Sequence, residues 1–521
     1  MKRAISIQVI RKNETWDVVV IGGGATGLGI ALEACTRGYS TLLVEQSDFA
    51  KSTSSKSTKL VHGGVRYLAQ GNIGLVREAS VERGLLYKNA PHLVKNLPFI
   101  IPVYSGWDRW KYGLGLKIYD WISGNLSMGP SNFISRAEVL KYMPNIRQTY
   151  LKGGVRYYDG QFDDARLALN IAQTIFEQGG YAINYVKAVT INKTDKRVSG
   201  ITIEDLETGA KYNVKAKAVV NATGVFADEI IRMDQPGATK TLAVSQGVHI
   251  VLDKKFLNGN HALMIPKTGD GRVLFLLPWH GKIIAGTTDT NTDKLVLEPV
   301  ALEKEIDFIL ETASGYLTVK PVRRDVLSIF AGLRPLAASS KPGHGTKEIS
   351  RSHKIIVSPS RLFTIIGGKW TTYRKMGEDM VDKIEKELSL KATSSKTAGL
   401  PIHGFSKDIM KNDPLYFYGS DQPAIKSLLS EPDDFTISDT LPVSKAQVLW
   451  AIREEMARTL EDVLSRRTRC LLLDAGETIR IAPLVANIMA SEMNKNEEWI
   501  HSQLTAFSNV ALNYTGVRDI S

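Results

Sequence analysis

Cysteine is scarce in this sequence, which has only two in 521 residues, Cys35 and Cys470. Two isolated thiols cannot build a disulfide framework or a cysteine-rich metal cluster, so we expect a reducing compartment and no bound metal. The sequence also lacks an uninterrupted apolar run that would predict a transmembrane helix, and it has no internal repeat. Any contact with a membrane is therefore expected to be peripheral.

Acidic residues are fewer than basic ones: 54 Asp and Glu against 66 Lys and Arg give a net charge of +12. This excess suits an anionic substrate, an anionic membrane surface or nucleic acid, and it does not choose among them. The remaining composition is ordinary for a globular protein, and the length allows two or three domains with cores of their own.

A dinucleotide-binding pattern runs through residues 17–46. A β-branched apolar run at 17–21 predicts a buried parallel strand, and glycines in G-x-G-x-x-G spacing follow it: Gly22, Gly24 and Gly27. The first glycine permits a tight turn, the second lets backbone N–H groups approach a pyrophosphate, and the third lets helix and strand pack closely. The N-terminus of the helix adds partial positive charge for the same anion.

An acidic residue completes this pattern at the end of the next predicted strand, 40–44. Glu45 follows Gly24 by about 20 residues, where a carboxylate accepts hydrogen bonds from the ribose of an adenine dinucleotide. A membrane span over 18–34 is the competing interpretation, and three consecutive glycines together with Glu33 argue against it. Dinucleotide binding is therefore the prediction for this stretch.

A second group of small polar residues follows at 46–68. Hydroxyls, a cation and paired glycines there favour a phosphate-and-flavin cradle over a plain surface loop. The cradle residues are expected to be Ser57, Thr58, Lys59, His62, Gly63 and Gly64. His62 is either a local hydrogen-bond partner or the point of a covalent flavin link, and the sequence leaves both open.

Motifs along nearly the whole chain carry a family resemblance. They are G-G-G-A-T-G at 22–27, S-S-K-S-T-K-L-V-H-G-G-V-R-Y-L at 54–68, A-P-H at 90–92, V-V-N-A-T-G at 219–224, G-T-T-D at 286–289, G-L-R-P-L at 332–336 and G-G-K-W-T-T-Y-R at 367–374. Together with Glu45, and in this order, they resemble the FAD-dependent, aerobic and quinone-linked glycerol-3-phosphate dehydrogenase family.

The resemblance implies an α/β fold. Its parts are a Rossmann-type FAD-binding domain, similar to those of glutathione reductase and D-amino-acid oxidase, an antiparallel β-sheet substrate domain and a C-terminal α-helical domain. We expect residues 1–399 to form a discontinuous FAD-binding domain, with the β-rich substrate domain inserted at roughly 244–353. A Lys/Thr/Ser linker at 391–396 places the boundary near 400, so that 400–521 form the helical domain.

The same motifs imply the site residues. His249 is the expected general base, since a neutral imidazole accepts a proton at physiological pH. Arg334 and Lys369 are placed near the reacting carbinol or the flavin, and the expected substrate ligands are Arg66, Thr287 and Arg351. Arginine suits a phosphate because its planar fork binds two oxygens at once. Gly224, Gly367 and Gly368 are expected against the FAD.

The reaction that the resemblance implies is the oxidation of sn-glycerol 3-phosphate to dihydroxyacetone phosphate. A hydride would pass from C2 to flavin N5, and electrons would continue to a membrane quinone. The implied location is the cytoplasm, with peripheral attachment to the inner face of the cytoplasmic membrane, and a homodimer is possible. A tryptophan-rich segment at 105–126 is either a membrane-interface helix or an ordinary packed helix.

Other acceptors and activities compete with this interpretation. An oxidase relative would pass the electrons to oxygen and make hydrogen peroxide, but such relatives often carry an insertion for which 521 residues leave little space. A basic FAD protein that modifies RNA would explain the net charge but not the arginines, so no nucleic acid is expected.

Trp370 departs from the smaller residue common in relatives. The charged run at 453–469 is expected to be a structural or interfacial helix face.

Overall fold

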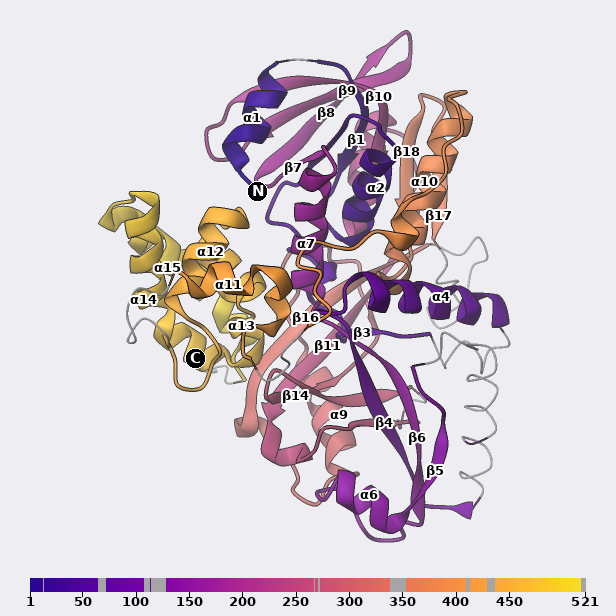
Figure 1. The fold of residues 1–521 in the computed structure, drawn as a ribbon, viewed down its shortest axis with the longest axis vertical. Helices are drawn as coiled ribbons and strands as arrows, with labels where there is room; N and C mark the ends of the chain where they lie inside the picture. Colours follow the sequence, from indigo (N-terminus) through magenta and orange to yellow (C-terminus); the bar gives the residue numbers. More distant parts are fainter. Residues whose placement is uncertain are drawn as a thin grey trace.

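The computed structural model describes residues 1–12, 14–63, 72–106, 113, 128–266, 268–269, 272–337, 353–408, 413–428 and 436–516. Its described part contains two β-sheets, one above the other in Figure 1, with a group of C-terminal helices at their side. The predicted tryptophan-rich segment at 105–126 lies almost entirely outside the described residues.

The first sheet has the strand order β17-β18-β10-β1-β2-β7. These strands are β1 (Trp16–Ile21), β2 (Thr41–Val44), β7 (Tyr181–Ile183), β10 (Lys211–Asn221), β17 (Lys354–Val357) and β18 (Leu362–Ile366). All neighbours in this row are parallel except β17 and β18. An antiparallel ribbon of β8 (Val186–Thr194) and β9 (Arg197–Asp205) extends β10.

Alternate residues of β1 face two different layers, as the period of a strand requires. Val18 and Val20 belong to a core shared with α2 (Ala25–Thr36), α7 (Asp164–Glu177) and α10 (Tyr373–Glu387). Val19 and Ile21 belong to a second core, which they share with the helices and strands of the opposite face. The strand is therefore buried on both sides, as its continuous apolar run predicted.

The second sheet has the order β15-β11-β14-β13-β12-β4-β6-β3, with β16 paired to β11 and β5 to β6. Its strands are β3 (Leu60–Val61), β4 (Lys95–Val103), β5 (Asn132–Ser135), β6 (Gly153–Gln161), β11 (Leu242–Asp253), β12 (Ala262–Ile265), β13 (Leu274–Trp279), β14 (Lys282–Gly286), β15 (Thr290–Asn291) and β16 (Val326–Ala337). The β-rich segment expected at 244–353 thus supplies only part of this sheet, because β3 to β6 join it from residues 60–161.

The C-terminal helices pack against this second sheet. They are α11 (Gln422–Lys426), α12 (Lys445–Glu454), α13 (Cys470–Leu473), α14 (Ala475–Met493) and α15 (Glu497–Ala511). Their core includes Trp279 and Phe330 of the sheet. The other α-helices of the described residues are α1 (Arg3–Arg11), α4 (Ile73–Asn89), α6 (Arg136–Tyr142), α8 (Ala227–Asp234) and α9 (Glu303–Ser314). Among the described residues, no helix combines the length and the hydrophobicity that crossing a bilayer requires.

The composition of residues 445–464 predicts one continuous helix, but in the structure α12 ends at Glu454. Glu455 turns inward to pair with Arg166 of α7, and Met456 has a positive φ of 54°. The charged run that follows is not a solvated face: Arg466, Arg467 and their acidic partner Asp48 are all buried. These charges join the C-terminal helices to the first sheet's domain.

Candidate active site

A cavity of about 440 Å³ is lined by residues of both sheets. Gly22, Gly24 and Glu45 line it from the first sheet, and His249 and Arg334 line it from the second. The structure therefore brings the predicted dinucleotide cradle and the predicted reacting residues to one space.

Two glycines of the fingerprint allow a close approach of strand and helix. Gly22 has a φ of +112°, and a Cβ there would lie 2.6 Å from the Ala222 carbonyl oxygen. A Cβ on Gly27 would lie 1.9 Å from the Gly22 carbonyl oxygen. No side chain fits at either position, so the turn and the start of α2 depend on both glycines.

The N-terminus of α2 and the acid of the fingerprint meet at this turn. Ser54 Oγ accepts a hydrogen bond of 2.9 Å from the Ala25 N–H. Glu45 accepts from the Gly23 N–H at 2.6 Å and from the Ser47 N–H at 2.8 Å, and burial raises its pKa. Each carboxylate oxygen keeps a second lone pair, which can accept a ribose hydroxyl.

Part of the second predicted cradle lies against the same cavity, whereas Lys59 and Gly63 do not line it. The lining residues from that prediction and from the later glycine motifs are Ser57, Thr58, His62, Gly224, Gly367 and Gly368. Lys59 lies elsewhere: its Nζ is buried 2.7 Å from Asp164 Oδ2, and burial lowers its pKa to about 7. The sequence showed the lysine but not its acidic partner, which is far away in the chain.

Three of the predicted residues, Gly64, Arg66 and Arg351, lie outside the described part of the chain. Gly63 is described, and it is not among the residues that line the cavity.

On the second sheet, the floor of the cavity has no side chain between His249 and Arg334. On β11 and β16, His249 pairs with Phe330, Gly247 with Gly332, and Ser245 with Arg334. The two central residues are glycines, so no side chain separates the imidazole from the guanidinium along this face. A Cβ on Gly247 would lie only 2.0 Å from Arg334 Nη2.

Arg334 is held by several acceptors around this floor. Its Nη2 donates to Thr287 Oγ1 at 2.9 Å and to the Thr288 carbonyl at 3.0 Å. Its Nη1 donates to the Gln246 carbonyl at 3.3 Å and lies 3.4 Å from Asp289 Oδ1. The guanidinium is therefore oriented before any ligand binds. Asp289 belongs to the G-T-T-D motif, but the motif did not reveal that this carboxylate helps to hold Arg334.

His249 is buried in the middle of β11. Its ring stacks on Phe330 with centroids 4.9 Å apart, and its Nε2 lies 2.9 Å from Thr58 Oγ1. Burial, followed by the nearby charges of Lys59 and Arg334, holds the pKa of the imidazole well below its ordinary value. The ring is therefore neutral at pH 7.

Lys369 and Trp370 line the cavity where the chain leaves β18. Trp370 Nε1 donates to the Ser54 carbonyl at 2.8 Å, and its ring meets Phe162 edge to face. Trp370 thus joins the Gly367–Gly368 turn to the loop after β2. This hydrogen bond gives Trp370 a definite place in the cavity wall.

Other lining residues were not singled out from the sequence. They come from β4, β6, β12, β13 and the segment before β13, and include Phe99, Tyr157, Asp159, Met264, Arg272 and Phe275. Alternation along a strand does not by itself tell which face meets a cavity.

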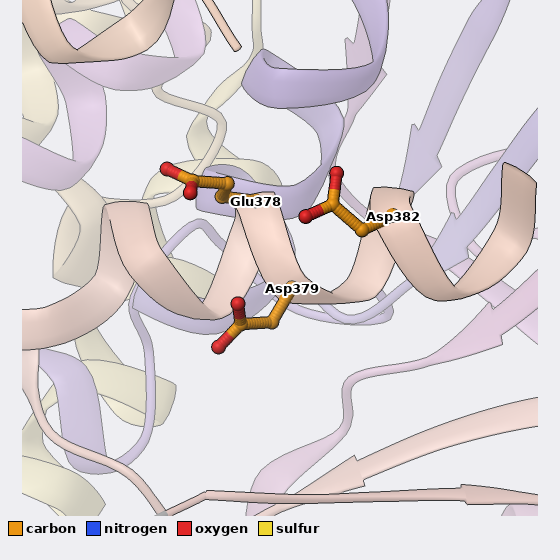
Figure 2. A group of neighbouring side chains, drawn as sticks. All are labelled: Glu378, Asp379 and Asp382. Atoms are coloured by element: carbon orange, nitrogen blue, oxygen red, sulfur yellow. The ribbon is translucent and has the colours of Figure 1, made fainter. Parts of the chain in front are cut away.

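A cluster of acids on α10 lies apart from these lining residues. Figure 2 shows Glu378, Asp379 and Asp382, whose oxygens lie within 4.8 Å of one another. Each acid pairs with a base: Arg374 with Glu378, Lys375 with Asp379, and Arg37 with Asp382. Ion pairs therefore account for the cluster.

Comparison with known proteins defines the class. A family model of FAD dependent oxidoreductases matches residues 17–372, and a model of the C-terminal domain of alpha-glycerophosphate oxidase matches residues 360–499. The chain is therefore an FAD-dependent oxidoreductase of this fold, with FAD as its cofactor. The glycine turn, the acid and the positive-φ glycines of the cavity fit that cofactor.

Similar sequences identify the family more closely. The chain is 39% identical over 535 residues to the mitochondrial glycerol-3-phosphate dehydrogenase of Rattus norvegicus, covering 95% of this chain and 73% of that one. It is 38% identical over 532 residues to a probable mitochondrial glycerol-3-phosphate dehydrogenase of Dictyostelium discoideum, covering 94% and 83%. The chain belongs to the FAD-dependent glycerol-3-phosphate dehydrogenase family, which confirms the resemblance seen in its motifs.

Solved structures agree with this fold. The glycerol-3-phosphate dehydrogenase of Bacillus halodurans, complexed with FAD, has a TM-score of 0.81 at 28% identity and covers 100% of this chain and 99% of its own. The L-alpha-glycerophosphate oxidase of Mycoplasma pneumoniae, at 17% identity and a TM-score of 0.56, shares the fold over 74% of this chain. The expected α/β fold class is confirmed.

Proposed function

We propose that this chain oxidises sn-glycerol 3-phosphate to dihydroxyacetone phosphate and passes the electrons to a quinone. The observation that carries the proposal is that His249, Thr287, Arg334 and Lys369 line the same cavity as the dinucleotide cradle. FAD, when bound, supplies the hydride acceptor. Loss of the hydroxyl proton and the C2 hydride converts the secondary alcohol to a ketone.

His249 takes the hydroxyl proton in this proposal. Its lowered pKa keeps the imidazole neutral, so a lone pair is present at physiological pH. A phosphate dianion in the same cavity stabilises the imidazolium that forms, because an opposite charge nearby raises a histidine pKa. Binding of the substrate therefore makes the ring a stronger base at the moment when a base is needed.

The cationic side chains bind the phosphate and stabilise the alkoxide in this proposal. Arg66 and Arg351 bind the phosphate, where two forked guanidinium groups match its oxygens. Arg334 and Lys369 act near the reacting carbinol, where positive charge stabilises the developing alkoxide. Thr287 supports this arrangement by accepting the 2.9 Å hydrogen bond from Arg334 Nη2.

For the electron acceptor we propose a quinone, with peripheral attachment to the inner face of the cytoplasmic membrane. The basic net charge of +12 supports the attachment, since an anionic lipid surface attracts a basic protein. The name dehydrogenase, which the similar sequences carry, favours an acceptor other than oxygen. Oxygen is the second candidate, because residues 360–499 match a domain named after alpha-glycerophosphate oxidase.

Steady-state assays of the purified FAD-loaded protein distinguish the two acceptors. With sn-glycerol 3-phosphate and a soluble quinone analogue, we expect one dihydroxyacetone phosphate for each quinone reduced, and little hydrogen peroxide in air. Peroxide formed in step with product, without any effect of quinone, would show an oxidase. No product with either acceptor would contradict the proposed substrate.

A further inference from the structure

Asp164, at the start of α7, is a buried carboxylate that takes no part in the mechanism above. Its Oδ2 accepts from the Ser57 N–H at 3.0 Å, from Ser57 Oγ at 2.7 Å and from Lys59 Nζ at 2.7 Å. Its Oδ1 accepts from the Ala165 N–H at 2.9 Å and from Arg469 Nη2 at 2.7 Å. One carboxylate thus joins the loop before β3 to a C-terminal arginine.

Arg469 holds the same loop at a second point. It stands just before α13, its side chain is 3% exposed, and its Nη2 also donates to the Ser55 carbonyl at 3.0 Å. Its Nη1 donates to the Ser465 carbonyl at 3.1 Å. The segment Ser55 to Lys59 is therefore fixed directly at Ser55 and through Asp164 at Ser57 and Lys59.

This segment carries Thr58, which is hydrogen-bonded to the proposed base. In the described part of the chain, the 2.9 Å contact with Thr58 Oγ1 is the one hydrogen bond made by the His249 ring, whose Nδ1 is buried without a partner. Stacking on Phe330 and the closeness of Gly286 restrict the plane of the ring. They leave the ring free to turn over within that plane, and the hydrogen bond with the Thr58 hydroxyl, which can donate to Nε2 or accept from it, holds one orientation.

We propose that Asp164 and Arg469 are positioning residues for the reaction, which fix the 55–59 segment so that Thr58 orients the His249 imidazole. The inference rests on the proposed function, in which His249 is the base. Neither Asp164 nor Arg469 lines the cavity, so the C-terminal region acts on the chemistry without touching the reacting atoms. A small displacement of a reacting group is enough to slow a step by about 100-fold.

The first test changes the hydroxyl that contacts the imidazole. Thr58→Val keeps the shape of the side chain and removes the hydrogen bond, and Thr58→Ser keeps it. We expect anaerobic reduction of the bound flavin by saturating sn-glycerol 3-phosphate to slow by about 10- to 100-fold in the FAD-loaded fraction of Thr58→Val. Thr58→Ser is expected to restore most of the rate. Wild-type rate constants in both variants would overturn the inference.

The second test changes Arg469, the C-terminal residue that holds the 55–59 segment. Arg469→Lys keeps the charge, but one ammonium cannot reproduce the separate contacts to Asp164, Ser55 and Ser465. We expect the rate constant of flavin reduction to fall about 10-fold. A role in stability alone would lower the amplitude of the reaction, which counts folded protein, and leave the rate constant unchanged, and that result would overturn the inference.

Arg458→Lys is the matched control, because it is the same substitution in another link from the C-terminal region. Arg458 pairs with Glu207 through contacts of 2.7 and 2.9 Å, and neither residue lines the cavity. We expect wild-type kinetics from this variant, and a slowing equal to that of Arg469→Lys would overturn the inference.

The double variant shows whether the two residues act in series. If Arg469 acts through Thr58, then Arg469→Lys adds little to the effect of Thr58→Val, and the two losses are strongly non-additive. Full additivity would overturn the proposed connection. Failure of the proposed function looks different: the wild-type flavin would then not be reduced by sn-glycerol 3-phosphate at all, and the inference would fall with it.

Discussion

Two residues without side chains, Gly247 and Gly332, make room in the cavity for the Arg334 guanidinium. The Gly247–Gly332 pair leaves an open floor on the second sheet, and the Arg334 guanidinium lies across that floor. Motif positions predicted Arg334 and His249 as site residues. The need for Gly247 could not be predicted in the same way, because it depends on the pairing register of β11 with β16.

Gly247→Ala tests this floor. A methyl group there would lie 2.0 Å from Arg334 Nη2, so the guanidinium must move out of its hydrogen bonds to Thr287 and Thr288. We expect kcat/KM for sn-glycerol 3-phosphate to fall by about 100-fold while FAD remains bound, because a misplaced cation loses its action on the transition state.

Gly237→Ala is the control for this change, since a Cβ at Gly237 meets nothing within 4 Å. It is expected to leave both FAD content and kcat/KM unchanged. Normal activity in Gly247→Ala would show that the guanidinium position seen here is not needed for turnover.

Elements that depend on contacts between residues close together in the sequence could be predicted from the sequence. The strand, glycine turn and helix of β1 and α2 appear where the fingerprint indicated, because the spacing of Gly22, Gly24 and Gly27 reflects contacts within that unit. The helix predicted at 445–464 failed for the opposite reason. The partner of Glu455 is Arg166, on a helix far earlier in the chain, and no local pattern reveals such a pair.

Gly27→Ala tests the turn as an element. The added Cβ would lie 1.9 Å from the Gly22 carbonyl oxygen, which forces the turn and the start of α2 apart. We expect purified protein with little bound FAD, measured as the ratio of flavin to protein absorbance.

Gly38→Ala is a poor control for that experiment because Gly38 has a φ of +93°, whereas Gly74→Ala is a good one. Gly74 lies on α4, and a Cβ there meets nothing within 4 Å. The control is expected to bind FAD fully. Stoichiometric FAD in Gly27→Ala would contradict the account of the turn.

At the scale of the whole molecule, buried ion pairs join the C-terminal helices to the rest of the chain. Asp48 accepts from both Arg466 and Arg467, and all three side chains are buried. Removing one partner from a buried pair typically costs about 3–5 kcal/mol, because the remaining charge loses its compensation. The sequence showed these arginines as a charged run, and only the tertiary structure shows that they face inward.

Arg467→Met tests this attachment, and we expect it to lower the thermal midpoint by several degrees. Arg453→Met is its control, since Arg453 forms an exposed pair with Glu492 at 2.7 Å, and such pairs contribute about 0–1 kcal/mol. Equal midpoints for the two variants would mean that the buried pairs do not hold the helices in place.

A second contact between the C-terminal region and the rest of the chain, made by His403, depends on pH. His403 contacts Glu177 at the end of α7 and Asp421 at 2.8 Å, and these carboxylates raise its pKa from 6.5 to about 9 against the effect of burial. A raised folded-state pKa stabilises the protein fully below pH 6.5, and this stabilisation is lost as the pH rises through about 9. The shift corresponds to roughly 3 kcal/mol at most.

The measurement compares wild type with His403→Gln at pH 6 and pH 9.5. We expect the variant to be less stable at pH 6, and the difference in thermal midpoint to shrink at pH 9.5. The comparison is needed because Lys59, with a pKa lowered to about 7, acts in the opposite direction over this range. A difference that does not change with pH would rule out His403 as the titrating group.

Anaerobic mixing of the FAD-loaded protein with sn-glycerol 3-phosphate tests the central claim most directly. If the cavity performs this oxidation, the oxidised flavin absorbance band bleaches, one dihydroxyacetone phosphate forms for each flavin, and glycerol without the phosphate has little effect. Deuterium at C2 is expected to slow the bleaching, since that hydrogen leaves as the hydride. A flavin that stays oxidised while the substrate is saturating would contradict the account.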